Sequence, residues 1–557
     1  MSTSSAPGPN INPDPLPMED VVSTNAVTAE AIARQNQTVV EEFQYLLEKS
    51  QQLFAGLSFV LENSYGLKRW EVGEIASKIG QLYYHYYSAL MIKKLRYYAR
   101  FTVVCLLLNN RDIISTLKDE LAALVKEYIN MYRPPDAAEW QLVVQEVASF
   151  TDAEKKLHPV NSGGLYLPVA RRLQISKVIS AALDKDGSSS TKLKLQEAIL
   201  VGNAHNQIKF SELTIDMYRM LQSLERETSQ IRGAADSTLK DVVPSAVATA
   251  VAAGAVNESS GSSAPVKDES TDDVAIAQRR TADKPTKRSN PHKYLLYRPT
   301  LSQIMVYLAT AFREIANDSA LLVYLSADGS KRSVPDQSGA KGYHGGILTN
   351  SRKVADNSDL DQQSISHCLH PGDLLPFTRK PMFLIVDSNN SVAFAEMPRV
   401  FNHPFMSLLS PAEYPASIPD TSQVGGLFTL FLHAPLLAFS FICGIEQISP
   451  DTWEQCSGLI TQAEGKIAEL MATAALDKSA RRFLQDEFLR QFMIRFALCY
   501  IILKAHTAFT EPKHLPTSYP LLPASVLESP EVLSKIRSLA VLANATCFSF
   551  EDPIVAS

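Results

Sequence analysis

The chain has 557 residues, of which 45% are hydrophobic and 20% are charged, and this globular composition allows roughly two to four domains. The formal net charge of −6 at pH 7 argues against a broadly basic surface for nucleic acid, although a local basic patch is compatible with it. Six cysteines without a CxxC pair are typical of a reducing compartment and not of a disulfide scaffold. We therefore expect no direct, sequence-specific binding of nucleic acid.

The N-terminal part predicts a disordered tail followed by an all-helical array. Residues 1–37 are rich in Pro and Ser and lack the apolar stretch of a secretory signal. Between residues 38 and 236, apolar side chains recur at the helical period. Helices are predicted at 39–54, 75–83, 95–108, 117–132, 140–150 and 210–224. Helix pairs with Tyr and Ala at packing positions suggest stacked hairpins of the tetratricopeptide kind, although no clean repeat of about 34 residues is present. Such arrays offer a concave surface to protein partners.

A predicted linker at residues 237–290 divides the chain. It consists mainly of Ala, Ser, Gly and charged residues, and no aromatic residue lies between Tyr218 and Tyr294, so it cannot bury enough apolar area to fold. A basic run in this linker suits a nuclear-import receptor; the alternative is a linker that its charge keeps solvated. The basic residues are Arg279, Arg280, Lys284, Lys287 and Arg288.

Residues 291–557 predict an α/β domain that ends in helices. Short continuous apolar runs are typical of strands buried on both faces. Such runs occur at 321–326, 382–387 and 405–410. Helices are predicted at 301–315, 453–470 and 488–496, and from the capping sequence Ser529-Pro530-Glu531 onward. Helix alternating with buried strand indicates a partly parallel sheet, so the fold class is mixed and mostly α.

One uncharged stretch raises the question of a membrane anchor. Residues 425–445 read GGLFTLFLHAPLLAFSFICGI and contain no Asp, Glu, Lys or Arg, and their length matches the roughly 20 residues that cross a bilayer. His433, Pro435 and the absence of Lys or Arg at either flank favour the other interpretation, a buried strand and helix in a domain core. A membrane-associated signalling protein held by this stretch is the first alternative function.

The usual catalytic signatures are missing from the sequence. It contains no GxxxxGK[ST], GxGxxG, GxSxG or HExxH, so we expect neither an enzyme nor a cofactor. His367, Cys368 and His370 offer three metal ligands within four residues, but a structural zinc site needs a fourth ligand, usually from a second cluster. The other interpretation of this motif is a loop with a buried cysteine.

A second candidate metal loop follows the predicted strand at 382–387. Asp387, Asn389 and Ser391 loosely resemble the DxSxS loop of von Willebrand A-like domains, with Asn389 where a Ser is expected. Such oxygens at the end of a strand suit Mg²⁺, and they also suit an ordinary strand-to-helix turn. A metal-dependent hydrolase that uses Asp387 and Ser391 is the second alternative function.

Several long strings resemble the family of SCAI, the suppressor of cancer cell invasion. Among them are EEFQYLLEKSQQLFAGL (41–57), KKLRYYARF (93–101), GNAHNQIKFSELTIDMYRMLQSLERE (202–227), NPHKYLLYRPT (290–300) and CLHPGDLLPFTRKPMFLIVDSNNSVAF (368–394). The resemblance implies a nuclear and cytoplasmic co-repressor that binds myocardin-related transcription factors and lowers transcription driven by serum response factor, downstream of Rho signalling. It also implies chromatin-associated partners linked to the repair of double-strand breaks. It supplies no catalytic or metal-binding residues.

The chain departs from this family at one point. Between residues 80–87 and 93–101 the family normally has a longer helical insert, and here only SALMI (88–92) remains. The loss of a helix pair leaves apolar faces of neighbouring repeats uncovered. The resemblance therefore predicts an altered helical array at this point.

Overall fold

The computed structural model describes residues 69–107, 111–164, 166–169, 171–173, 192–205, 207–226, 290–330, 345–350 and 367–550, together with Gln44, Tyr45, Glu48 and Gln52. The predicted tail, the basic run of the linker and nearly all of the predicted helix at 39–54 lie outside these residues. The chain divides into two compact units, Met1–Val144 and Gln145–Ser557.

In the first unit, two long helices pack against each other. They are α2 (Arg69–Leu107) and α3 (Arg111–Tyr132), and α4 (Ala137–Leu157) begins in the same unit. On α3, Leu117, Leu121 and Leu124 are buried at spacings of four and three, which is one face of a helix.

Helix α2 is continuous where the sequence predicts two helices. Residues 88–92, predicted to be a short connection, are helical and join the predicted helices at 75–83 and 95–108. This segment contains neither Gly nor Pro, so nothing in it interrupts the helical hydrogen bonds. The prediction of separate helices is therefore wrong here, and the tetratricopeptide-like arrangement stays a prediction.

The second unit is built on a six-stranded sheet with the order β11-β10-β9-β5-β1-β4. The strands are β1 (Lys194–Asn203), β4 (His292–Tyr297), β5 (Ser319–Ala327), β9 (Met382–Asp387), β10 (Phe405–Leu409) and β11 (Thr517–Tyr519). All neighbouring pairs are parallel except β10 and β11. The predicted strands at 321–326, 382–387 and 405–410 and the partly parallel sheet are confirmed.

Strand β1 corrects the predicted domain boundary. It precedes the predicted linker, yet it pairs with β4 on one side and with β5 on the other, with Leu200 opposite Leu295 and Tyr324. The α/β unit therefore begins at residue 145 and not at 291, and residues 38–236 are not a helical domain of their own. The predicted helix at 210–224 is shorter in the structure. A small hairpin, β2 (Lys209–Phe210) and β3 (Leu213–Thr214), precedes α6 (Ile215–Ser223).

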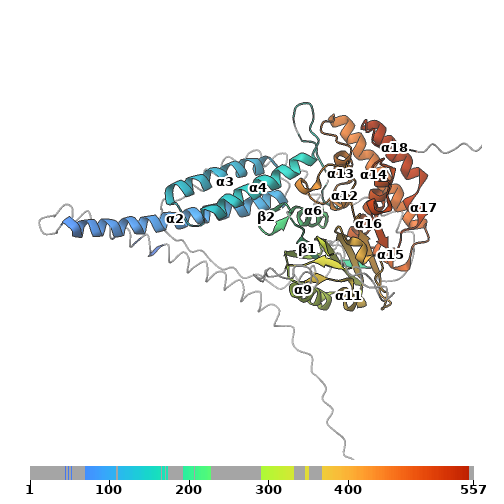
Figure 1. Ribbon diagram of the computed structural model, residues 1–557, viewed down its shortest axis with the longest axis horizontal. Coiled ribbons are helices and arrows are strands. Elements are labelled where there is room, and N and C mark those ends of the chain that lie inside the picture. The colour runs from blue at the N-terminus through green and yellow to red at the C-terminus, as the bar shows by residue number, and fades with distance from the viewer. Residues whose placement is uncertain are drawn as a thin grey trace, which may run out of the picture. The chain divides into compact units, whose positions relative to one another are not determined.

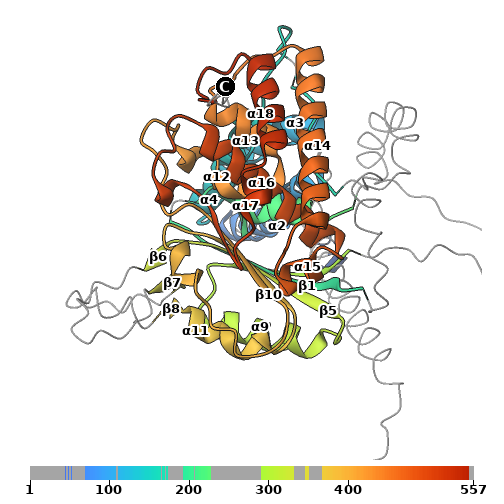
Figure 2. The same ribbon diagram turned by 90° about the vertical axis from the view of Figure 1, so that its right-hand side faces the viewer.

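Helices cover both faces of this sheet. Figure 2 shows α9 (Leu301–Glu314) and α11 (Pro371–Leu374) on one face and a larger helical layer on the other. The larger layer contains α12 (Leu427–His433), α13 (Pro435–Ile442), α14 (Pro450–Thr473), α16 (Glu487–Ala505), α17 (Ala524–Leu527) and α18 (Pro530–Leu542), and α15 (Lys478–Phe483) lies nearer to the sheet (Figure 1). A smaller sheet consists of β6 (Gly329–Ser330), β7 (Gly346–Leu348) and β8 (Cys368–Leu369). The predicted helices at 301–315, 453–470 and 488–496 are present, and Ser529 caps α18 by accepting the amide hydrogen of Val532.

The stretch at 425–445 forms two short buried helices, α12 and α13, where the sequence predicts a strand and a helix. Pro435 has no amide hydrogen to continue α12, and it occupies the first turn of α13 instead. Phe428 and Phe439 are at most 1% exposed. Within the described residues, no helix combines the length and the apolar character that crossing a bilayer requires.

Candidate functional site

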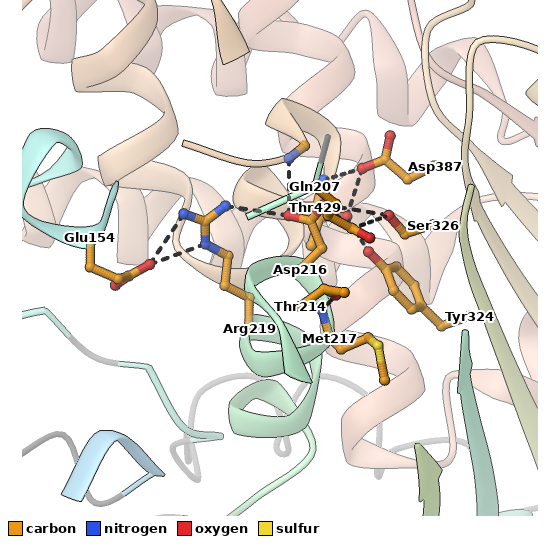
Figure 3. A network of polar contacts seen from close by, with 11 residues as sticks. Glu154, Gln207, Thr214, Asp216, Met217, Arg219, Tyr324, Ser326, Asp387 and Thr429 are labelled. Carbon is orange, nitrogen blue, oxygen red and sulfur yellow. Dashed lines mark hydrogen bonds and ion pairs between the residues drawn. The ribbon is translucent and has the colours of Figure 1, made fainter. Parts of the chain in front are cut away.

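The candidate site lies at the carboxyl ends of β1, β5 and β9. The chain leaves β1 towards β4 but leaves β5 towards β9, so the sheet order reverses between β1 and β5. Open α/β sheets bind their ligands at such a point. Here the helices α6 and α12 bring polar side chains to this position (Figure 3).

Two aspartates, the buried Asp216 and the half-buried Asp387, form the centre of the cluster. Asp216, at the start of α6, accepts hydrogen bonds from the Gly426 amide at 2.9 Å and from Gln207 Nε2 at 3.2 Å. Asp387, the last residue of β9, accepts from the Thr429 amide at 3.1 Å and from the Thr429 hydroxyl at 2.6 Å. Burial, and next the negative charge of Asp216, raise the pKa of Asp387 to about 6. Asp387 therefore takes up its proton as the pH falls through about 6, and at pH 7.5 it is a charged group in an unfavourable position.

A fully buried arginine connects this centre to α4. Arg219 Nη1 lies 3.5 Å from Asp216 Oδ1, and its Nη2 lies 3.1 Å from Glu154 Oε1. Arg171 Nη2 lies 2.5 Å from the other oxygen of Glu154. Burial opposes ionisation of Glu154, but the two guanidinium groups outweigh it and hold the pKa of that carboxyl well below its usual range. Positive and negative buried charges thus alternate from Arg171 through Glu154 and Arg219 to Asp216. Figure 3 shows the last three of these groups.

Two consecutive glycines let the carboxylates approach α12. Gly425 has φ +89°, and a Cβ there would lie 2.6 Å from Asp216 Oδ1 and 2.7 Å from Arg219 Nη1. A Cβ at Gly426 would collide with Asp387 Oδ2. The pair Gly425-Gly426, which the sequence suggests only as the start of an apolar stretch, is therefore required by this close packing.

Asp387→Asn is expected to stabilise the protein by about 2 kcal/mol at pH 7.5 and to leave it nearly unchanged at pH 4. The raised pKa of Asp387 means that the folded state binds its proton more tightly than the unfolded state does. The free energy of unfolding therefore falls as the pH rises from about 4 through about 6. Asparagine cannot ionise and can still accept the bonds from Thr429. Urea unfolding of both proteins at the two pH values measures the difference.

The control for this substitution is Asp477→Asn. Burial of Asp477 is outweighed by the hydrogen bond from Arg399, so the pKa of Asp477 is lowered and its substitution removes stability at pH 7.5. An Asp387→Asn protein that is less stable than the parent at pH 7.5 would contradict the raised pKa of Asp387.

The loop residues predicted as magnesium ligands do not converge. Asn389 Oδ1 accepts the amide hydrogen of Gly329 at 2.7 Å, and Ser391 Oγ donates to the Ser410 carbonyl at 2.7 Å. Asp387 points instead towards Thr429. These hydrogen bonds are of the kind found in a turn, and the magnesium site stays a prediction.

The predicted motif His367-Cys368-Leu369-His370 falls at β8 and the start of α11. Cys368 is buried in β8, and His370 is the residue before the first turn of α11. Among the described residues, the His, Cys, Asp and Glu side chains that come together closely enough for a cation are Glu197, His292 and Glu314, whose ligand atoms lie within 4.8 Å of one another. Because these three lie far apart in the sequence, no local motif indicates them.

A groove lies on the larger helical layer, away from the polar cluster. It has a volume of about 1330 Å³ and is lined by the end of α16, the segment after it, and α18. Ile501, Phe509 and Leu533 are among its apolar lining residues, and Lys504 and Glu528, which form an ion pair at 2.6 Å, also line it. Its mixed lining suits a protein segment better than a small polar substrate.

Comparison with known proteins places the chain in a family. The family model described as Protein SCAI matches residues 45–89 and 87–509, and the two stretches meet where the resemblance implies a shortened insert. Protein SCAI of Homo sapiens is 37% identical over 609 residues, covering 96% of this chain and 93% of the relative. Protein SCAI of Mus musculus is 37% identical over 585 residues, covering 92% and 90%. A Protein SCAI homolog of Dictyostelium discoideum is 30% identical over 693 residues, covering 90% and 89%. No solved structure matches. The chain therefore belongs to the SCAI family.

Proposed function

We propose that this chain is a protein-binding transcriptional co-regulator of the nucleus and cytoplasm. In this proposal it acts as a co-repressor: it binds transcription factors of the myocardin-related type and lowers transcription driven by serum response factor and Rho signalling. Chromatin-associated proteins are further partners. Membership in the SCAI family, over 96% of the chain, is the observation that carries the proposal.

The polar cluster supports binding rather than catalysis. Asp216 and Asp387 occupy the position where an α/β enzyme binds its substrate, but they accept hydrogen bonds from Gly426 and Thr429 of the same chain. Arg219 is 0% exposed and is paired with Glu154. Groups that satisfy one another in this way hold the sheet edge and α12 together, and they leave little polar surface to a substrate.

Helix α2 offers a surface that suits an acidic partner. Tyr97 is 60% exposed, and its ring stacks on Phe101 with a centroid distance of 5.7 Å. The exposed side chains of Lys94, Arg96 and Arg100 surround it in the sequence. Aromatic and Arg side chains are enriched at the energetic centres of protein interfaces.

The experiment is capture of a myocardin-related transcription factor by the full-length chain, combined with a reporter driven by serum response factor. The double variant Tyr97→Ala/Arg100→Ala is expected to bind about tenfold more weakly and to lose repression. Leu90→Ala, at a 39% exposed apolar position of the same helix, is the matched control and should bind normally. If the unaltered chain neither captures the factor nor represses the reporter, the proposal fails.

Localisation is tested separately. Replacement of Arg279, Arg280, Lys284, Lys287 and Arg288 by Ala should lower the nuclear fraction of the full-length chain. An unchanged nuclear fraction would remove the import role of this basic run and leave partner binding untouched.

A further inference from the structure

Two cysteines from distant parts of the sequence meet in the larger helical layer. The Sγ atoms of Cys443 and Cys547 lie 3.4 Å apart although the residues are 104 positions apart. Both thiols are free and partly exposed. The other four cysteines are all buried. They are Cys105, Cys368, Cys456 and Cys499.

The ends of two helices bring these thiols together. Cys443 is the C-cap of α13, and the helix is closed by Gly444 with φ +64° and by a bond from the Ile445 amide to the Ser440 carbonyl. Helix α18 ends in the same way, with Asn544 at φ 54° and a bond from the Ala545 amide to the Ala540 carbonyl. Both are Schellman-type ends, which turn the chain sharply after the last helical residue. The second turn leads directly to Cys547.

The segment around Cys547 is held against the chain that follows α16. The Cys547 carbonyl accepts the amide hydrogen of Thr507 at 2.9 Å, and the Ser549 amide donates to the Ala505 carbonyl at 3.0 Å. The hydrogen bond with Cys443, and the neighbouring His506, outweigh the effect of burial and lower the pKa of Cys547 to about 5. The thiolate is the nucleophilic form of cysteine, and a lowered pKa with partial exposure marks a reactive thiol.

We propose that Cys443 and Cys547 form a reversible oxidation site, in which hydrogen peroxide converts the two thiols into an intramolecular disulfide. The Cys547 thiolate attacks one peroxide oxygen, the O–O bond breaks, and the released hydroxide takes up a proton to become water. The sulfur of Cys443 then attacks the sulfenic acid on Cys547. The S–S bond forms, the S–O bond breaks, and the hydroxyl leaves as a second water with the proton of Cys443. Two thiols are oxidised and one peroxide is reduced to two waters.

The geometry needs only a small adjustment for this step. The sulfur atoms must approach by about 1.4 Å to reach the S–S bond length of about 2.0 Å. The space beside Gly444, next to Cys443, is open, because no atom lies within 4 Å of a Cβ built there. In a reducing compartment such a pair is expected to be mostly reduced and to respond to oxidant, which is how disulfides act in intracellular proteins.

The disulfide acts on the groove of the helical layer. Ala505, Thr507 and Ser549 line that groove. The hydrogen bonds from Thr507 to Cys547 and from Ser549 to Ala505 hold this rim against the segment of Cys547. A covalent link to α13 fixes this rim. Oxidation is therefore expected to stabilise the rim and to alter what the groove can accept.

The experiment treats the purified, reduced full-length chain with hydrogen peroxide. Free thiols are blocked with N-ethylmaleimide, disulfides are reduced and labelled with iodoacetamide, and the peptides are identified by mass spectrometry. The expected result is a peroxide-dependent, dithiothreitol-reversible link between Cys443 and Cys547, with a melting temperature about 5 °C higher. A folded chain that shows no such link, or that oxidises all six cysteines equally, would overturn the proposal.

Serine variants separate the role of Cys547, which reacts with peroxide, from the role of Cys443, which reacts with the sulfenic acid. Cys443→Ser should leave a sulfenic acid on Cys547 that dimedone traps, because no second thiol resolves it. Cys547→Ser should give no product at Cys443. Cys456→Ser, at a buried cysteine, is the matched control and should oxidise like the parent. The peptide link in the unaltered chain decides the question even if one serine variant fails to fold.

Discussion

Arg219→Met is expected to lower the free energy of unfolding of the second unit by about 4 kcal/mol. The guanidinium is 0% exposed and pairs with Glu154 and Asp216. Methionine fills a similar volume but leaves Asp216 as a buried charge next to Asp387, and an unpaired buried charge is far more costly than a missing pair. Urea unfolding, followed by the fluorescence of buried Trp453 in a Trp70→Phe/Trp140→Phe background, measures the loss.

The same substitution at a surface ion pair is the control. Arg399 Nη1 lies 2.9 Å from Asp477 Oδ2, and the two side chains are 34% and 30% exposed. Because water screens exposed pairs, Arg399→Met should lower the free energy of unfolding by less than about 1 kcal/mol. If the two variants lost equal stability, the buried chain of charges would not be the source of the effect.

Gly425→Ala is expected to lower the free energy of unfolding by about 3 kcal/mol. About 1 kcal/mol of this is the cost of holding an L-residue at positive φ, and the rest is the collision with Asp216 and Arg219. Neither group can move away easily, because Asp216 also accepts a hydrogen bond from Gln207 and Arg219 is paired with the buried Glu154. The melting transition and urea unfolding should report the same loss.

Gly444→Ala isolates the backbone contribution. Gly444 also has positive φ, at +64°, but no atom lies within 4 Å of a Cβ built there. This variant should lose only about 1 kcal/mol. Equal losses at Gly425 and Gly444 would mean that the polar cluster can rearrange to make room for a methyl group.

Much of the second unit could be predicted from its sequence. Strands β5, β9 and β10 are continuous apolar runs, and the predicted ranges nearly coincide with the observed ones. Strand β1 has the same kind of signal in its segment AILV, but this segment lies among helical patterns and before the linker, so the local sequence predicts no strand there. What places it in the sheet is pairing with residues about a hundred positions away, which no local pattern encodes.

Only one residue of the polar cluster, Asp387, could be identified from the sequence. Asp387 stands out because an Asp directly after an apolar run marks the end of a strand. Asp216 and Arg219 lie on α6, and the apolar stripe there indicates a helix. It gives no sign that these polar side chains are also buried. Burial of an Arg depends on the partners that several distant elements supply, so it follows from the tertiary structure and not from helical periodicity.

The position of β1 also determines how the chain can be divided. A protease cut between residues 226 and 290 would leave β1 in one fragment and both of its neighbours, β4 and β5, in the other. We expect such fragments to stay associated and to separate only on denaturation, as the halves of a split reporter do. The sheet also cannot close during synthesis until β4 and β5 have left the ribosome, so folding of this unit depends on contacts of long sequence separation and should be slow.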